Sequence, residues 1–260
     1  MNPIPPALRG VARLYGPEGL DRLRSARVLI VGLGGVGSWT VEALARSGLG
    51  ALDLVDLDEV CTTNINRQIH ALHSTVGQAK AELLAERCRL INPDLAVTSH
   101  FMYYTATTCD RLLLPNLSLV IDAIDSIPHK CHLLATCRER GIPVVTTGGG
   151  GGKMRPELIM VEDLSRTRND PLLARTRKIL RQKFAFPRSL KTRFGIPTVY
   201  SPELPQPPRP DPETGAAPAG RLDCAGGLGS EVAVTATLGL LAASVAQRLL
   251  LNNGASKDSQ

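Results

Sequence analysis

Short apolar runs alternate with segments of helical periodicity through the first half of the chain. Residues 28–31 form one such run, which ends in glycines and is typical of a parallel strand buried on both faces. Residues 39–47 follow with a helical pattern that Gly48 ends. Further strands are predicted at residues 52–55, 96–101, 119–122 and 143–146. The alternation predicts an α/β fold, a Rossmann-like, doubly wound and mostly parallel sheet with helices on both faces.

A second helix is predicted after the first two strands. Ser74 belongs to the residue types that cap helices, and the helical pattern continues from it to about residue 91. Ala79, Leu83 and Leu90 recur at near-helical spacing, so we expect them to face the core.

The second half of the chain is less regular. Five glycines at 148–152 leave the backbone free to approach a ligand, and an apolar segment follows at 158–161. Asp170 and Pro171 begin a predicted helix. Its apolar residues, expected to face the core, are Leu172, Leu173, Leu180 and Phe184.

Two further segments complete the chain. Residues 202–218 are rich in proline and predict an exposed loop. Residues 232–246 lack charge but are shorter than the ~20 residues needed to span a bilayer, so they predict a buried helix and no stable membrane insertion. We expect one domain over residues 1–260. Its parts are a core at 27–165, a basic and proline-rich insertion at 166–222 and a C-terminal helical extension at 223–260.

Composition indicates a globular protein with an aliphatic core, because 43% of residues are hydrophobic and only 3% aromatic. The net charge of +6 is local, since residues 166–193 contain ten Lys or Arg and one acidic residue. The predicted helix in this stretch can present Arg175, Lys178 and Arg181 along one side. That side is expected to bind phosphates, although an ordinary solvated helix has the same pattern.

The cysteines indicate an intracellular protein. They are scattered without CxxC spacing and without a preceding signal peptide, which predicts reduced thiols and a cytoplasmic location. No four-thiolate zinc site is expected. Cys224 is expected to be a packed cysteine, because no neighbour in sequence would lower its pKa.

A glycine-rich turn lies directly after the first predicted strand and opens the first predicted helix. In this context backbone N–H groups and the helix dipole bind phosphate. Asp56 follows at the end of the second strand, where a carboxylate accepts hydrogen bonds from ribose hydroxyls, and Asp58 can support it. The glycines of the turn are Gly32, Gly34, Gly35 and Gly37. Together these residues predict a nucleotide site.

The surrounding residues favour ATP over a nicotinamide cofactor. The segment 64–68 is basic and rich in amides, with Asn64, Arg67 and Gln68. Arg67 and Lys80 could neutralise a triphosphate, and Asp125 at the end of a predicted strand could hold Mg²⁺. Each of these residues taken singly is also a common surface residue.

The same residues carry a family resemblance. GxGGxG, the two aspartates at 56 and 58, NxxRQ at 64–68, Lys80 and the Asp-Ser pair at 125 resemble the ThiF/MoeB/HesA superfamily, whose members adenylylate carboxylates. More narrowly, ARLYG at 12–16, DEVCTTNINRQIHAL at 58–72, VIDAIDS at 120–126, PVVTTGG at 143–149 and DCAGG at 223–227 are similar to the bacterial tRNA threonylcarbamoyladenosine dehydratase branch.

The resemblance implies a function and partners. ATP would adenylylate the carboxylate of threonylcarbamoyladenosine in a tRNA anticodon loop, and the side chain would then cyclise with loss of AMP. It implies that Asn64, Arg67 and Lys80 bind triphosphate, that Asp125 binds Mg²⁺, and that Arg13 reaches into the site of the partner subunit of a homodimer. A monovalent cation at the glycine run and a sulfur-transfer partner protein are further expectations.

Three alternatives stay open from the sequence alone. An NAD-dependent oxidoreductase would share the glycine turn and Asp56. An adenylyltransferase could instead activate the C-terminus of a ubiquitin-like sulfur carrier. A module that binds ATP and RNA without turnover is the third, and intact Arg67, Lys80 and Asp125 argue against it.

Overall fold

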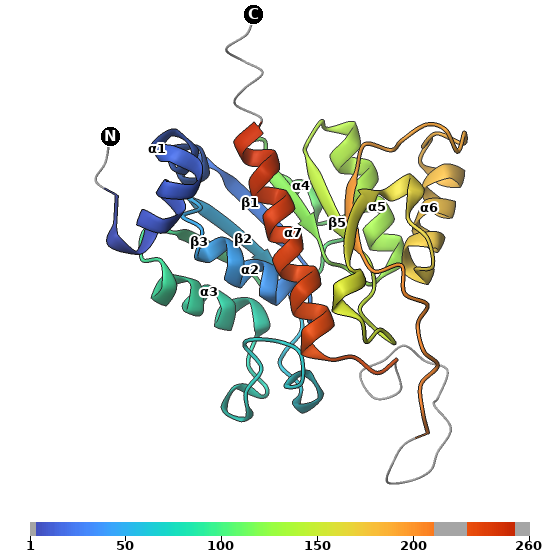
Figure 1. Cartoon of the computed structure of the whole chain (residues 1–260), viewed down its shortest axis with the longest axis horizontal. Helices are drawn as coiled ribbons and strands as arrows, with labels where there is room; N and C mark the ends of the chain where they lie inside the picture. Colours follow the sequence, from blue (N-terminus) through green and yellow to red (C-terminus); the bar gives the residue numbers. More distant parts are fainter. Residues whose placement is uncertain (1–3, 211–227, 253–260) are drawn as a thin grey trace, which may run out of the picture.

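The computed structural model describes residues 4–210 and 228–252, which form a central sheet between two layers of helices (Figure 1). The strands of this part are β1 (Arg27–Val31), β2 (Ala51–Val55), β3 (Ala96–His100), β4 (Leu119–Asp122), β5 (Val144–Thr147), β6 (Met160–Asp163) and β7 (Pro197–Tyr200). They lie in the order β3-β2-β1-β4-β5-β7-β6. All neighbours are parallel except β6, which runs antiparallel to β7. The predicted doubly wound α/β fold is confirmed.

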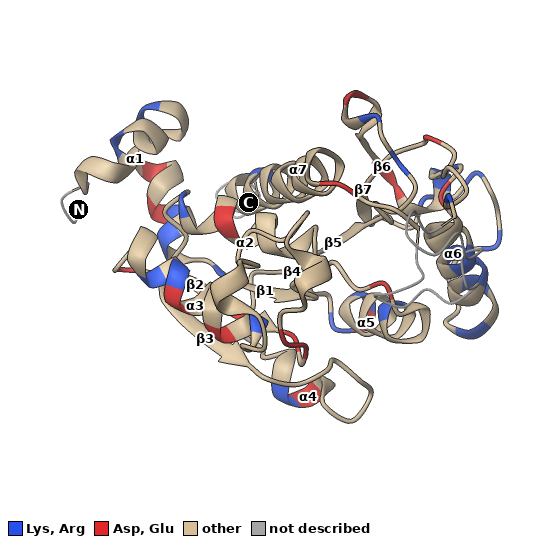
Figure 2. Cartoon of the chain, turned by 90° about the horizontal axis from the view of Figure 1, so that it is seen from below, with Lys and Arg blue, Asp and Glu red and all other residues tan. Residues whose placement is uncertain are grey.

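Helices cover both faces of the sheet because successive strand residues point to opposite sides. Val28 and Ile30 of β1 pack in one apolar layer, whereas Leu29 and Val31 pack in the other. The first layer contains α1 (Arg9–Ser25), α2 (Gly37–Ala45), α3 (Lys80–Ile91) and α7 (Val232–Asn252). The second contains α4 (Cys109–Leu112), α5 (Ile127–Glu139) and α6 (Pro171–Lys183). Figure 2 shows α2 and α7 on one side of the sheet and α4 and α5 on the other.

Helix α3 begins later than predicted. Ser74 lies in a short 3-10 turn, η3 (His73–Thr75), and the helix starts at Lys80. Two local features explain the delay: Gly77 has a φ of +84°, and Ala79 is extended and pairs with Glu59 in an isolated bridge. The buried face also differs from the prediction.

The core side of α3 is formed by Ala81, Leu84, Ala85 and Cys88. Leu90, which the sequence pattern placed inside, is 81% exposed. The predicted face was wrong because Leu83 and Leu90, at about 100° per residue, lie on the side of the helix opposite to these four buried residues.

The C-terminal helix α7 is buried as predicted but is longer than the uncharged stretch that predicted it. It spans 21 residues. Judged by length and composition alone, it is the one helix among the described residues that could cross a membrane. More than half of its apolar window is buried inside the protein, against α2 and the strands β4, β5 and β7. The helix therefore serves as a core element of this fold.

The predicted proline-rich loop is only partly described. Residues 202–210 contain neither helix nor strand, which agrees with the prediction. Residues 211–218 and Cys224 lie outside the described residues.

Candidate functional site

The glycine turn after β1 is fixed by contacts that only glycine permits. Gly32 has a φ of +90°, and a Cβ atom there would lie 2.7 Å from the carbonyl oxygen of Ala123. A Cβ atom at Gly37 would lie 1.8 Å from the carbonyl oxygen of Gly32. By contrast, the nearest atom to a Cβ at Gly34 is Nε2 of Gln68 at 3.9 Å, so the turn is open at this point. The backbone at Gly34 is therefore free to approach a phosphate.

Asp56 is held directly beneath this turn. Its Oδ2 accepts the N–H of Leu33 at 2.7 Å, and its Oδ1 accepts the N–H of Asp58 at 2.8 Å. Burial raises the pKa of Asp56, and the two backbone hydrogen bonds only partly offset that effect. The carboxylate at the end of β2 is thus fixed in orientation, as a ribose-binding group requires.

Lys80 and Asp58 form an ion pair beside Asp56. The Lys80 ammonium lies 2.9 Å from Oδ2 of Asp58, and Lys80 is only 5% exposed. Tyr103 donates its hydroxyl to Oδ1 of Asp58 at 3.0 Å. This hydrogen bond is the main cause of the raised pKa of Tyr103, and the charges of Asp56 and Asp125 add to it. These effects place Asp125 in the same acidic neighbourhood.

The amide-rich segment after β2 folds over the glycine turn. Asn64 is buried, and its carbonyl oxygen accepts the N–H groups of Arg67 and Gln68. The Arg67 side chain passes over Gly35, and its Nη1 donates to the carbonyl oxygen of Thr63 at 2.8 Å. Within the described residues, Oε1 of Gln68 is buried and accepts no hydrogen bond. Such an acceptor is expected to find its donor in a bound ligand.

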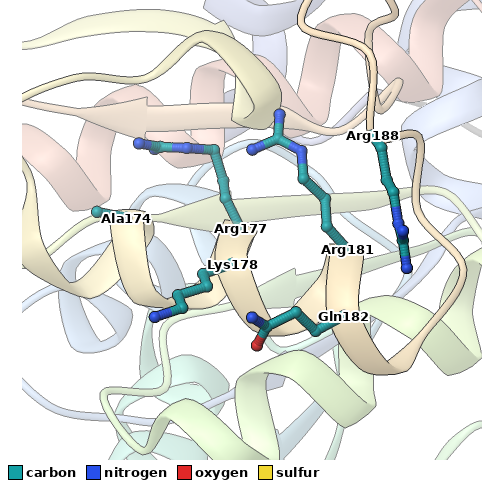
Figure 3. Close-up of a pocket in the computed structure, with 6 residues that line it drawn as sticks. All are labelled: Ala174, Arg177, Lys178, Arg181, Gln182 and Arg188. Atoms are coloured by element: carbon teal, nitrogen blue, oxygen red, sulfur yellow. The ribbon is translucent and has the colours of Figure 1, made fainter.

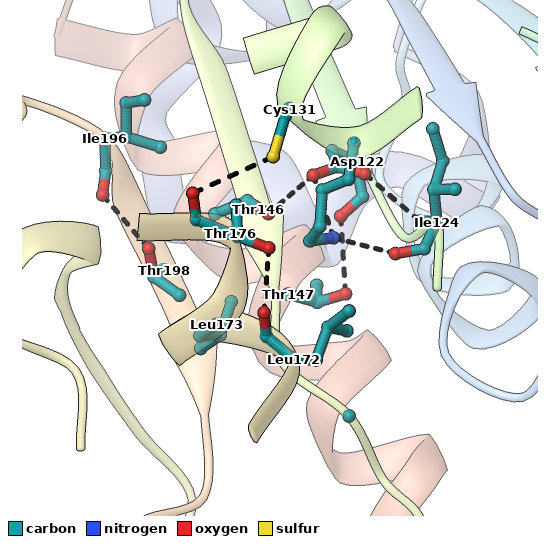
Figure 4. Close-up of polar contacts among 12 residues, drawn as sticks. Asp122, Ile124, Cys131, Thr146, Thr147, Leu172, Leu173, Thr176, Ile196 and Thr198 are labelled. Carbon is teal, nitrogen blue, oxygen red and sulfur yellow. Dashed lines mark hydrogen bonds and ion pairs between the residues drawn. The ribbon is translucent and has the colours of Figure 1, made fainter. Parts of the chain in front are cut away.

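The loop before Asp125 is held in place by a buried ion pair, and Figure 4 shows Ile124 of this loop beside Asp122. Lys130 Nζ lies 2.8 Å from Oδ2 of Asp122, and neither side chain is exposed. Lys130 also donates to the carbonyl oxygen of Ile124 at 2.9 Å, and the N–H of Ile124 donates to Oδ1 of Asp122 at 3.1 Å. Thr146 donates to the same carboxylate from β5 at 2.6 Å.

Neither member of this pair was predicted from the sequence. Asp122 ends a predicted strand, but no helix was predicted around Lys130, which lies in α5.

A second buried ion pair, also missed, lies beside the glycine run. Lys153 Nζ lies 2.8 Å from Oδ2 of Asp170 and 3.0 Å from the carbonyl oxygen of Ser201. Asp170 caps α6 through the N–H of Leu173 and accepts the N–H of Gly149. The glycine run is thereby fastened to the start of α6.

Thr235 of α7 connects the glycine run with the phosphate-binding turn. Its Cγ2 would lie 3.2 Å from a Cβ at Gly35 and 3.0 Å from a Cβ at Gly150. The two glycine segments, separated by more than 100 residues in sequence, therefore flank the same methyl group.

Some expected residues are not brought to this site. Arg13 is exposed on α1, and in the described part of the chain no hydrogen bond or ion pair joins it to the residues above. Arg175, Lys178 and Arg181 lie on α6, away from the glycine turn (Figure 1). Within residues 4–210 and 228–252, no group of three His, Cys, Asp or Glu is arranged to hold a metal ion.

The comparisons with known proteins agree with this geometry. The ThiF family matches residues 8–175. The chain is 45% identical to the tRNA threonylcarbamoyladenosine dehydratase of Escherichia coli K12, over 95% of this chain and 94% of the relative. Crystal structures of the E. coli enzyme with ATP and with AMP superpose with TM-scores of 0.86 and 0.85, at 42% and 43% identity. The ATP complex covers 96% of both chains, and the AMP complex 95% of this chain and 94% of the other.

Proposed function

This chain belongs to the ThiF family, and from that premise we propose that it is an ATP-dependent tRNA threonylcarbamoyladenosine dehydratase. The observation that carries the proposal is the glycine turn with Asp56, Arg67 and Lys80 around it, in a chain similar over its full length to an enzyme whose structures hold ATP and AMP. A nicotinamide cofactor carries a diphosphate, whereas two cations at the turn suit the larger charge of a triphosphate.

The chemistry proceeds in two balanced steps. A carboxylate oxygen of the threonylcarbamoyl group attacks the α-phosphorus of ATP, a P–O bond forms, and the bond to the β-phosphate breaks to release pyrophosphate. A nitrogen or oxygen atom of the carbamoyl group then attacks the activated carbonyl carbon of the acyl-adenylate. The ring bond forms, the bond from that carbon to the AMP oxygen breaks, and the attacking group loses a proton, so that the net change in the nucleoside is loss of water. Because AMP is a good leaving group, no covalent bond to the enzyme is needed, and the protein's task is to position the reactants and neutralise phosphate charge.

The residues of this chain divide that task. The backbone at Gly34 and Gly35 approaches the phosphates, and Asp56 accepts the ribose hydroxyls. Arg67 and Lys80 neutralise the triphosphate. Asn64 shapes the segment that carries Arg67, and the buried acceptor of Gln68 lies beside Gly34. The residues present therefore fit ATP.

Asp125 would hold Mg²⁺ together with phosphate oxygens and water, because Mg²⁺ sites commonly use one or two carboxylates plus the substrate's phosphates. When bound, the ion supplies charge neutralisation at the departing pyrophosphate. A monovalent cation at the glycine run stays a prediction. The ammonium of Lys153 already occupies the carboxylate of Asp170 beside that run.

Partners follow from the same proposal. The tRNA substrate meets the insertion 166–222 beside the nucleotide-binding core 27–165, with Arg175, Lys178 and Arg181 on helix α6. The active unit is a homodimer in which Arg13, exposed on α1, reaches the partner's site. A sulfur-transfer partner stays a prediction. The enzyme acts on tRNA in the cytoplasm.

Mass spectrometry of tRNA nucleosides tests the function directly. The protein is incubated with tRNA carrying threonylcarbamoyladenosine, ATP and Mg²⁺, and the digested nucleosides are compared with a reaction lacking ATP. The modified nucleoside should lose the mass of one water, with one AMP and one pyrophosphate formed per conversion. An unchanged nucleoside mass with a fully folded, ATP-binding protein would refute the proposal, and pyrophosphate release that depends on an added sulfur-carrier protein would favour the alternative acceptor.

A further inference from the structure

A pocket on α6 is lined almost entirely by basic side chains (Figure 3). Its volume is about 380 Å³. Positions 174, 177, 178, 181 and 182 recur at helical spacing, so they form one stripe along α6. In Figure 3, Arg177 and Arg181 extend from one side of the stripe, Lys178 and Gln182 from the other, and Arg188 from the segment that follows the helix. The lining residues are Ala174, Arg177, Lys178, Arg181, Gln182 and Arg188.

The positive charge of this α6 pocket is not neutralised by the described residues. Arg177, Lys178, Arg181 and Arg188 take part in none of the ion pairs formed within residues 4–210 and 228–252. Burial lowers the pKa of Arg177, and the nearby charge of Arg181 lowers it further. The lining that the structure describes contains four cations and no acidic side chain, and Asp170 acts on Arg177 only from outside it, so an anionic ligand would supply a counter-charge.

Arg181 is held in place rather than free in solvent. Its guanidinium lies over the Phe194 ring at 4.9 Å from the centroid, and its Nε donates to the carbonyl oxygen of Pro187 at 3.2 Å. Phe194 is fixed in turn by an edge contact with Phe186. Nη2 of Arg181 is buried and donates to no atom of the described residues. A positioned donor without an acceptor is costly in a ligand-free protein, and an incoming anion offsets that cost.

The location of the α6 pocket indicates how large the anion must be. Helix α6 begins at the ligand-binding edge of the sheet, where Asp170 accepts the N–H of Gly149. Arg181 lies eleven residues further along the helix, about 16 Å away at 1.5 Å per residue. A single ligand that contacts both this edge of the sheet and Arg181 must therefore span about this distance, as a polymeric anion does.

We propose that the α6 pocket binds a backbone phosphate of the tRNA substrate, a proposal that rests on the proposed function. It changes the set of basic residues expected from sequence. Lys178 and Arg181 line the pocket, Arg177 and Arg188 join them, and Arg175 is exposed outside it. Guanidinium groups provide two parallel N–H donors for phosphate oxygens, which suits three of the four cations to this ligand.

Two double variants that each remove two positive charges distinguish phosphate binding in the α6 pocket from general electrostatic attraction of tRNA. Lys178→Ala with Arg188→Ala removes one helix cation and one loop cation from the pocket, and both residues are exposed, so the fold should persist. Lys183→Ala with Lys191→Ala removes one helix cation and one loop cation that do not line it, and both are also exposed. Affinity for a fluorescently labelled substrate tRNA is measured for each from 0.1 to 1 M salt, with ATP affinity as an internal standard.

The pocket variant should reduce the slope of log affinity against log salt by about 0.7–0.9 units, because the pocket holds one phosphate and the slope changes by ~0.7–0.9 per lost phosphate contact. If affinities converge at 1 M salt, it should bind tRNA about 5- to 8-fold more weakly at 0.1 M, and its KM for tRNA should rise with kcat nearly unchanged. The control variant should stay within about 3-fold of wild type, because charges outside a contact act only through screened attraction.

Other outcomes separate this proposal from the proposed function. If both variants lose the same tRNA affinity, or if both bind tRNA like the wild type, the pocket is not a specific tRNA site. Dehydration of the tRNA by the wild type would still support the proposed function in that case. Weakened binding of inorganic phosphate with unchanged tRNA binding assigns the pocket to a small anion and overturns the proposal. If the wild type binds tRNA through the pocket but does not dehydrate it, the pocket stands and the function fails. A wild type that does not bind tRNA refutes both.

Discussion

Replacing Lys153 by methionine would leave the charge of Asp170 buried without its cation. Both side chains are about 1% exposed, and the Lys153 ammonium lies 2.8 Å from Oδ2 of Asp170. Removing one partner of a buried ion pair costs about 3–5 kcal/mol. We expect the lower end, about 3 kcal/mol, because the N–H groups of Gly149 and Leu173 still donate to the carboxylate. At an m-value near ~3 kcal/mol/M, the urea midpoint should fall by about 1 M.

A second substitution tests whether the charge is responsible. Lys153→Met combined with Asp170→Asn removes both charges, and asparagine keeps one side-chain oxygen to accept the N–H of Leu173. The double variant should therefore be more stable than Lys153→Met alone, by about 1–2 kcal/mol. Lys183→Met is the matched control, because this lysine is exposed at the end of the helix that Asp170 caps. The free energy of unfolding of this variant should stay within about 0.5 kcal/mol of the wild type.

Equilibrium urea unfolding, followed by circular dichroism at one fixed protein concentration, measures all the variants. A double variant no more stable than the single one would show that Lys153 does not compensate the charge of Asp170. If Lys153→Met is as stable as the wild type, the ion pair does not contribute to the stability of the fold.

The remaining predictions concern catalysis and pH. Arg67→Ala and Lys80→Ala should each lower turnover by at least ~100-fold in a pyrophosphate-release assay while the fold persists, because each removes a charge that acts on the transition state. Asp125→Asn should behave likewise, and excess Mg²⁺ should not restore the full rate; near-normal rates in all three variants would exclude this mechanism. Burial lowers the pKa of His70 to about 4 from the ordinary 6.5. Between these two pH values the His70 imidazole is protonated in the unfolded chain but neutral in the folded protein. The free energy of unfolding should therefore rise with pH across this window, by up to about 3 kcal/mol. His70→Leu should reduce the pH dependence of the urea midpoint between pH 4 and 6.5, whereas His73→Leu, at an exposed position, should leave it unchanged. An equally steep pH dependence in both variants would contradict the assignment to His70.

The parts of the site that are continuous in sequence were predictable. Glycines after an apolar run, and an aspartate at the end of the next run, carry their geometry in local backbone requirements. The structure confirms that requirement at Gly32 and Gly37, where any Cβ atom would collide with a backbone carbonyl.

The buried ion pairs could not be predicted because each depends on burial, which the sequence does not state. A lysine in sequence indicates a solvated side chain, and Lys130 and Lys153 are exceptions because each is buried against a carboxylate, Asp122 at the end of β4 and Asp170 at the start of α6. The face of α6 posed a related problem. Spacing in the sequence grouped Arg175 with Lys178 and Arg181 on one side of the helix. The way the helix packs on its neighbours places Arg177 in the pocket in place of Arg175.

The packing of α7 has a consequence for the order in which the site can form. Thr40 in α2 donates to the carbonyl oxygen of Gly239, 199 residues later, and Thr235 contacts both glycine segments. A ribosome releases the glycine turn and Arg67 long before α7 exists. Until α7 emerges, the apolar layer beside α2 is uncovered and one wall of the nucleotide site is missing. A nascent chain that stops before residue 232 therefore holds nearly every side chain proposed to bind phosphate and still lacks one wall of the proposed ATP site.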